Sequence, residues 1–159
     1  MPTSQPFAKR RRCGFIGVAL IGILNLVGCS QTLHVEPAED SNNPRCADVT
    51  VRLPDSLGTY GREWTDGQAT GAWGSKPAVM LRCGVAVPAP TDLVCQTIYG
   101  IDWIIFAQEK DVQQMVTYGR DPAIQVVISR DAGLDFADTL EDLGKSIKAG
   151  LSVPSGQCS

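Results

Sequence analysis

The chain has 159 residues, of which 14 are basic, 17 are acidic and one is a histidine, so its formal net charge is −3. The acidic residues are spread along the chain and there is no basic stripe, which excludes the electrostatic pattern of a nucleic-acid-binding protein. The length is that of a single domain.

Residues 1–28 have the parts of a bacterial signal peptide. The basic stretch Lys9–Arg12 precedes an apolar core that runs from Gly14 to Val27. A helix over that core would be roughly 21 Å long, which is short against a hydrocarbon thickness of about 30 Å. The core therefore suits a signal peptide better than a permanent membrane span, and we expect everything after it to be exported.

The end of the core predicts where the signal is cut. Leu26-Val27-Gly28-Cys29 resembles the bacterial lipobox, in which the cysteine sulfur receives a diacylglyceryl group and the peptide bond before it is cleaved. An ordinary signal peptide or an uncleaved anchor is the alternative interpretation. Because two acyl chains hold a protein stably on a membrane, we expect Cys29 to keep the protein on the outer face of the cytoplasmic membrane. The remaining 131 residues carry 10 basic and 17 acidic side chains, a net charge of −7.

The stretch from 29 to 43 is polar and predicts a flexible tether, because it cannot bury enough apolar surface to offset the entropy of ordering. The only histidine, His34, lies in it. Asn43 followed by Pro44 is typical of a helix start, and Pro54 would end that helix. The β-branched residues 49–51 favour a strand instead, so both interpretations stand. A single globular domain is expected over residues 44–159.

Residues 58–71 are polar and rich in glycine, and they predict a surface loop. Four apolar or alternating stretches then predict strands, at 78–85, 98–106, 112–118 and 123–129. Short turns separate these stretches, and strands joined by short turns pair antiparallel.

The clearest pattern is the last one, where apolar residues recur at helical spacing. These residues are Phe136, Leu140, Leu143, Ile147 and Leu151. Acidic residues crowd the start of this stretch and lysines its end, which suits the helix dipole. The predicted fold class is therefore α+β: a single antiparallel sheet of about four or five strands, with two helices packed on one face and two disulfides.

The disulfide prediction comes from the four cysteines of the domain, which are Cys46, Cys83, Cys95 and Cys158. An even number of cysteines in an exported chain predicts two disulfides, for which three pairings exist. The spacings are too wide for a zinc site, and we expect neither metal nor cofactor. If a hairpin is centred on Ala89, Cys83 faces Cys95, and Cys46 then pairs with Cys158. A shift of one residue in that hairpin would separate the two thiols.

One carboxylate lies in an apolar strand. Asp102 stands between Ile101 and Trp103, where an unpaired charge would cost several kcal/mol. We expect a buried ion pair with Arg82 or Arg120. The alternative is a ligand or partner site. Its candidate residues are Trp73, Arg82, Asp102, Trp103 and Arg120.

No catalytic residue is predicted, and whether the protein is an enzyme stays open. A nucleophile–base arrangement needs a histidine or a similar base, and the only histidine is in the expected tether. Catalysis by carboxylates alone is not excluded by the sequence.

Four short blocks carry a resemblance to a known family: Ala72-Trp73-Gly74, Leu81-Arg82-Cys83-Gly84-Val85, Gly100-Ile101-Asp102-Trp103 and Tyr118-Gly119-Arg120-Asp121-Pro122. In this order they are similar to the actinobacterial envelope proteins of domain-of-unknown-function family 3515 (DUF3515), over about residues 44–151. Members of that family are typically exported, membrane-associated or lipid-anchored proteins without an assigned activity. The resemblance implies domain bounds and location, and it assigns no catalytic residue.

Two classes of function follow. The first is a lipid-anchored extracytoplasmic module that binds a protein or a cell-wall partner. The second is a binder of a small molecule or glycan, or a carboxylate-based enzyme, that uses the region of Asp102, Arg82 and Arg120. An exposed apolar patch would favour the first class, and a deep pocket with two convergent carboxylates would favour the second.

Overall fold

The computed structural model describes residues 32–106, 109, 111–151 and 157–158. The predicted signal peptide and Cys29 lie outside these residues. The elements are α1 (Pro44–Thr50), β1 (Ser56–Leu57), β2 (Tyr60–Glu63), β3 (Thr70–Trp73), β4 (Val79–Val85), β5 (Val94–Ile98), β6 (Ile101–Ile105), β7 (Val112–Thr117), β8 (Ala123–Ser129), a 3₁₀ turn (Arg130–Ala132) and α2 (Phe136–Gly150). In the described part of the chain, no helix is long and apolar enough to cross a membrane.

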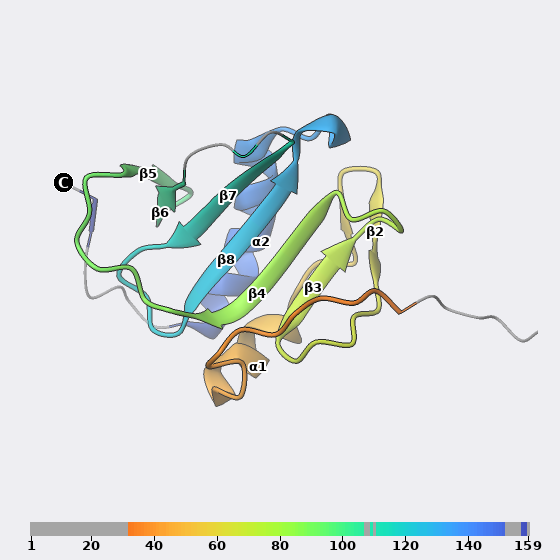
Figure 1. The fold of residues 1–159 in the computed structure, drawn as a ribbon, viewed down its shortest axis with the longest axis horizontal. Helices are drawn as coiled ribbons and strands as arrows, with labels where there is room; N and C mark the ends of the chain where they lie inside the picture. Colours follow the sequence, from red (N-terminus) through yellow and green to blue (C-terminus); the bar gives the residue numbers. More distant parts are fainter. Residues whose placement is uncertain (1–31, 107–108, 110, 152–156, 159) are drawn as a thin grey trace, which may run out of the picture.

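The strands form one antiparallel sheet in the order β1-β2-β3-β4-β8-β7-β6-β5 (Figure 1). The expected count of four or five strands was wrong, because the sheet has eight. Three of the additional strands lie in or next to segment 58–71, which predicted a surface loop: β2 lies inside it, β3 begins in it and β1 directly precedes it. The fourth, β5, is largely exposed and carries no run of buried apolar residues. β1 and β5 are the edge strands, and edge strands need backbone pairing more than buried side chains, so their sequences resemble those of loops. β3 lies inside the sheet and all four of its residues are buried, but it is too short for a clear strand pattern.

Both helices cover the same face of the sheet. Alternate residues of β4 and β8, such as Leu81 and Val126, are fully buried and join one core with α1 and α2. From α2 this core receives Leu140, Leu143 and Ile147, as the helical spacing predicted. Each fully buried aliphatic side chain of this kind stabilises the fold by about 2 kcal/mol. The helix begins where Asp135 caps it, since its side chain accepts a hydrogen bond from the backbone N–H of Asp138.

The first helix starts at Pro44, as expected, with the Asn43 side chain accepting a hydrogen bond from the Arg45 N–H. It ends at Thr50, before the predicted stop at Pro54. The β-branched residues 49–51 therefore do not form a strand.

The connection between β4 and β5 overturns the predicted hairpin. The two strands are separated in the sheet by β8, β7 and β6, so residues 86–93 cross the sheet instead of turning back. Four interstrand steps of about 4.8 Å amount to roughly 19 Å, and eight extended residues reach about 26 Å. The segment is thus long enough to cross, and nothing in its sequence requires a turn at Ala89.

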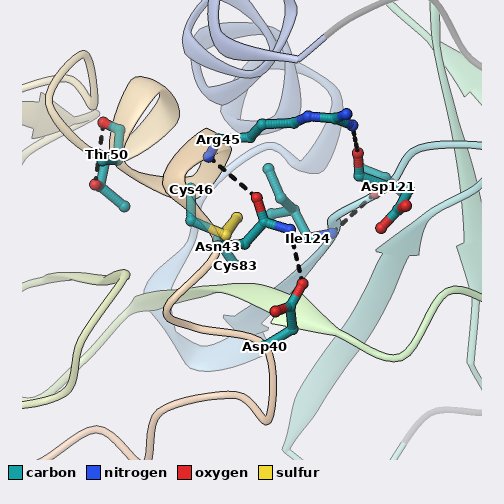
Figure 2. The surroundings of a disulfide bond; sticks show 10 residues. Asp40, Asn43, Arg45, Cys46, Thr50, Cys83, Asp121 and Ile124 are labelled. Carbon is teal, nitrogen blue, oxygen red and sulfur yellow. Dashed lines mark hydrogen bonds between the residues drawn. A yellow bond between two sulfur atoms is a disulfide. The ribbon is translucent and has the colours of Figure 1, made fainter.

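The disulfide pairing was wrong for the same reason. The bonds are Cys46–Cys83 and Cys95–Cys158, so all four cysteines are paired, but not as predicted. The first bond joins α1 to β4 on the helix-covered face, where Cys46 and Cys83 are fully buried (Figure 2). The second bond joins β5 to the end of the chain.

The expected tether is also corrected over its described part. Leu33 forms a parallel bridge with Thr65, and the Asp40 N–H donates to the Gly84 carbonyl. Val35 is buried, and its carbonyl oxygen lies 1.9 Å from where a Cβ on Gly67 would stand. Residues 32–43 therefore pack against the domain. Backbone hydrogen bonds attach them to it, and the polar side chains of this segment do not predict those bonds.

Candidate functional site

The two tryptophans among the predicted site residues belong to the core. Trp73 on β3 and Trp103 on β6 are fully buried, each with 0% of its surface exposed. The Trp73 indole N–H donates to the carbonyl of Pro54, 3.0 Å away. Their burial accounts for both residues structurally, and neither reaches a surface where a partner could contact it.

Arg82 lies elsewhere, on the sheet face turned away from the helices. It alternates with the buried residues Leu81 and Cys83 along β4, and its guanidinium donates two hydrogen bonds to the side-chain oxygen of Gln125 on β8, one of them 2.7 Å long. It borders a depression of about 310 Å³ on that face. Gln125, and not Asp102, is therefore the partner of Arg82.

Asp102 is nearly buried on β6 and is hydrogen-bonded at both carboxylate oxygens. The Thr97 hydroxyl donates to one oxygen at 2.5 Å, and the backbone N–H of Cys158 donates to the other at 2.9 Å. Burial lowers the pKa of Arg120, and the negative charge of Asp102 opposes that shift. Arg120 also donates a hydrogen bond to the carbonyl of Leu151.

The strand opposite Asp102 is the last one of the sheet. β5 and β6 form a hairpin in which Ile98 pairs with Ile101, and the two loop residues, Tyr99 and Gly100, both have positive φ. Two-residue hairpin loops favour this conformation because its twist matches that of the strands. The Lys148 ammonium of α2 lies 4.9 Å from the centre of the Tyr99 ring, which holds the turn against the helix.

The hairpin register shows where the backbone groups of β5 point. The Asp102 carbonyl accepts a hydrogen bond from the Tyr118 N–H, so the backbone of Asp102 bonds toward β7. In an antiparallel pair, hydrogen-bonded and non-hydrogen-bonded residues alternate, so Thr97 opposite Asp102 directs its N–H and C=O away from β6. Cys95, two residues earlier, does the same. These groups face the free edge of the sheet, where a further strand could pair.

Apolar side chains gather beside this free edge. Within the described part of the chain, three of the six large apolar residues that are exposed lie between positions 93 and 99: Leu93, Val94 and Tyr99. A cleft of about 340 Å³ adjoins them, with Leu93, Ile104 and the Cys95–Cys158 bond in its wall. We call β5 together with these three residues the distal edge. No other strand of the described chain pairs with its outer backbone groups, and apolar contact surface lies beside them. Recognition of an extended polypeptide requires both features.

Sequence reasoning missed this edge, because Val94–Ile98 carries no buried apolar alternation. A signal was present nonetheless. Tyr99-Gly100 between Ile98 and Ile101 is a two-residue turn flanked by β-branched residues, and that arrangement predicts a hairpin. In the described part of the chain, no group of three or more histidine, cysteine, aspartate or glutamate residues could hold a metal ion.

The family model described as "Protein of unknown function (DUF3515)" matches residues 18–153. No curated protein and no solved structure shows significant similarity to the chain.

Proposed function

We propose that this chain, which belongs to the DUF3515 family, is an exported module that a lipid on Cys29 holds on the outer face of the cytoplasmic membrane. Its role there is to bind an envelope partner, and we place that binding at the distal edge. The partner is an extended segment of another protein, which adds a strand to β5.

The export half of the proposal is supported by the disulfides together with the lipobox. Cytosolic proteins rarely keep structural disulfides, because the glutathione and thioredoxin systems reduce them. Here two disulfides join segments that are 37 and 63 residues apart. The lipobox Leu26-Val27-Gly28-Cys29 predicts the location at the membrane, and the family resemblance implies an actinobacterial envelope.

The binding half rests on one observation, the free edge of β5 with its exposed apolar neighbours. An open strand edge invites pairing with other chains, and proteins usually blunt such an edge with lysine, proline or a covering loop. No lysine or proline interrupts β5, and the exposed fraction of Val94 is 59%. Among the residues that the structure describes, no strand covers this edge, and an open edge of this kind supports a partner that does.

The second class of function, a small-molecule or glycan binder or a carboxylate enzyme, has less support. Its three residues do not all converge: the charges of Arg120 and Asp102 act on each other, but Arg82 bonds Gln125 instead. The carboxylate of Asp102 is itself bonded by Thr97 and Cys158. These contacts favour a structural role for Asp102.

Site-specific photo-crosslinking in cells that make the full precursor tests the binding proposal. A photoreactive residue in place of the exposed Gln96 lies on the distal edge, and the same residue in place of the exposed Lys76 serves as the matched control. We expect a discrete protein adduct from position 96 that is absent from position 76. Adducts of equal yield from both positions, or adducts to glycan alone, would refute a protein partner at β5.

The anchor has its own test. Mass spectrometry of the mature protein should find a diacylglyceryl-modified peptide that begins at Cys29, and Cys29→Ala should leave the precursor unprocessed or release the protein. A Cys29→Ala protein that loses its signal and still sediments with membranes would refute the anchor.

A further inference from the structure

Two further exposed apolar residues of the described chain lie together at the opposite edge of the sheet. Trp64, directly after β2, and Val51, directly after α1, are 75% and 74% exposed. Both line a cleft of about 630 Å³ that also contains Arg62 and Asp55. We call Trp64, Val51 and this cleft the proximal edge.

The beginning of the described chain is bonded to this same edge. The Leu33 N–H donates to the carbonyl of Trp64 over 2.7 Å, and the Asp66 N–H donates to the carbonyl of Leu33 over 3.1 Å. Figure 1 shows the first described residues, in orange, on the side of β2 and β3, with β5 at the other end of the sheet. The point where the chain joins the domain and the most exposed tryptophan are therefore neighbours.

Only four residue steps separate Leu33 from Cys29. A chain extends by at most 3.3–3.6 Å per residue, so Leu33 can stand no more than about 14 Å from the lipid-bearing cysteine. The headgroup layer is about 5–8 Å thick on each side of a bilayer. A domain attached so closely has the proximal edge at the membrane surface.

We propose that the proximal edge docks on the lipid leaflet, with Trp64 and Val51 in the headgroup region, and so fixes the orientation of the domain. This inference rests on the proposed lipid anchor at Cys29. The occupant of the cleft is the membrane itself, and the distal edge then points away from the membrane, toward the envelope.

The chemistry of the proximal edge suits a bilayer interface. Tryptophan is enriched at that depth because its ring is apolar while its indole N–H can still donate to polar groups. The cleft is lined by one cation, Arg62, and two carboxylates, Asp55 and Glu63. The Arg62 guanidinium donates to the carbonyls of Leu53 and Thr50, and the charge of Asp55 acts on it. Docking therefore buries apolar side chains without leaving the Arg62 charge uncompensated.

The intrinsic fluorescence of the lipidated mature protein in vesicles tests this inference. The chain has three tryptophans, and two of them, Trp73 and Trp103, are fully buried. In vesicles that contain phosphatidylcholine brominated on its acyl chains, we expect quenching of the exposed component and protection of that component from aqueous iodide. Trp64→Phe should abolish both effects. Val51→Asp should weaken the quenching, and Val94→Asp at the distal edge should not change it.

The possible outcomes separate the anchor from the docking. If the protein floats with the vesicles and iodide quenches Trp64 while brominated lipid does not, the anchor stands and the docking is refuted. If Trp64 is shielded from both quenchers, protein and not lipid covers it, and the docking is again refuted. If the lipidated protein does not float with vesicles, both the anchor and the docking fail.

Discussion

The two ends of the sheet differ in what borders them. At the proximal edge, three short strands are joined to the N-terminal segment, and the exposed apolar residues Trp64 and Val51 flank a cleft. At the distal edge, a single strand is left open and a disulfide fastens the end of the chain to it. The interstrand spacing of about 4.8 Å puts β2 and β5 roughly 29 Å apart. A domain anchored near one edge therefore presents the other edge at a distance from the membrane.

The two disulfides follow the same division, and their removal should give the largest effects on stability. The chain-entropy model assigns about 4 kcal/mol to the closure of the 37-residue loop by Cys46–Cys83, which is fully buried. We expect a loss of that size in urea melts of the double variant Cys46→Ala, Cys83→Ala.

The matched variant Cys95→Ala, Cys158→Ala should lose clearly less, although its loop of 63 residues is longer. Cys95 and Cys158 are both partly exposed, so their truncation leaves no buried cavity of the kind that truncation of the fully buried Cys46 and Cys83 leaves. Equal losses from the two double variants would contradict this account of the distal bond.

Asp102 stabilises the distal edge through the hydrogen bonds that its carboxylate accepts from Thr97 and Cys158. Asp102→Asn should lower the free energy of unfolding by about 2 kcal/mol, because its hydrogen bonds to Thr97 and Cys158 lose the charged acceptor. Thr97→Val should cost about 1 kcal/mol, and the exposed Asp92→Asn serves as the control with no change. Thermal and urea melts measure all three. A loss from Asp102→Asn no larger than that from Asp92→Asn would rule out this structural role.

A single added methyl group, at Gly67, should detach residues 32–43 from the proximal edge. A Cβ at Gly67 would lie 1.9 Å from the Val35 carbonyl oxygen, whereas a Cβ at Gly61 meets nothing within 4 Å. Gly67→Ala should therefore expose the amides of residues 33–41 to hydrogen exchange and cost about 1 kcal/mol, while Gly61→Ala leaves them protected. Unchanged exchange in Gly67→Ala would contradict the packing of this segment.

The smallest effect concerns pH at the proximal edge. The His34 ring nitrogen and an Asp66 carboxylate oxygen are 2.8 Å apart, which raises the pKa of His34 above its ordinary value of 6.5 and lowers that of Asp66 below 3.8. The stabilisation that comes from the raised His34 pKa is fully present below pH 6.5 and is lost as pH rises through the raised pKa. The stabilisation that comes from the lowered Asp66 pKa is present above pH 3.8 and is lost as pH falls through the lowered pKa. The pair is thus strongest between pH 3.8 and 6.5.

Because His34 is the only histidine, its ring protons can be followed by NMR during a titration. We expect Asp66→Asn to return the His34 pKa toward its ordinary value, and Glu36→Gln to change it less, since the Glu36 contribution is smaller. The same His34 pKa in the Asp66→Asn variant and in the unmodified protein would show that this pair does not form.

The sequence predicted those parts of the fold that side-chain burial determines. The alternation of Ile124, Val126 and Ile128 and the helical spacing of Leu140 and Leu143 follow from one buried face, and both elements are where the pattern placed them. The edge strands are held by backbone pairing, for which Val94–Ile98 offers no apolar signature. The disulfide pairing depends on strand order, and the crossing segment 86–93 can reach several positions.

For the candidate sites, the sequence identified residues that are buried and not those that are exposed. Trp73, Trp103 and Asp102 are notable in the sequence because of their residue types and their apolar neighbours, and all three are buried in the domain. Trp64 and Val94 attract no attention in the sequence. Their interest comes from exposure next to a free edge or to the chain's point of attachment, which only the assembled sheet brings together.

The difference between the two edges can be measured with a single fluorophore placed at either one. In lipidated protein bound to vesicles with brominated acyl chains, Trp64 should be strongly quenched. In the double variant Trp64→Phe, Gln96→Trp, the tryptophan at the distal edge should be quenched no more than it is in vesicles without bromine, because it stands roughly 29 Å along the sheet from β2. Equal quenching at the two positions, or stronger quenching at position 96, would contradict the orientation on which the account depends.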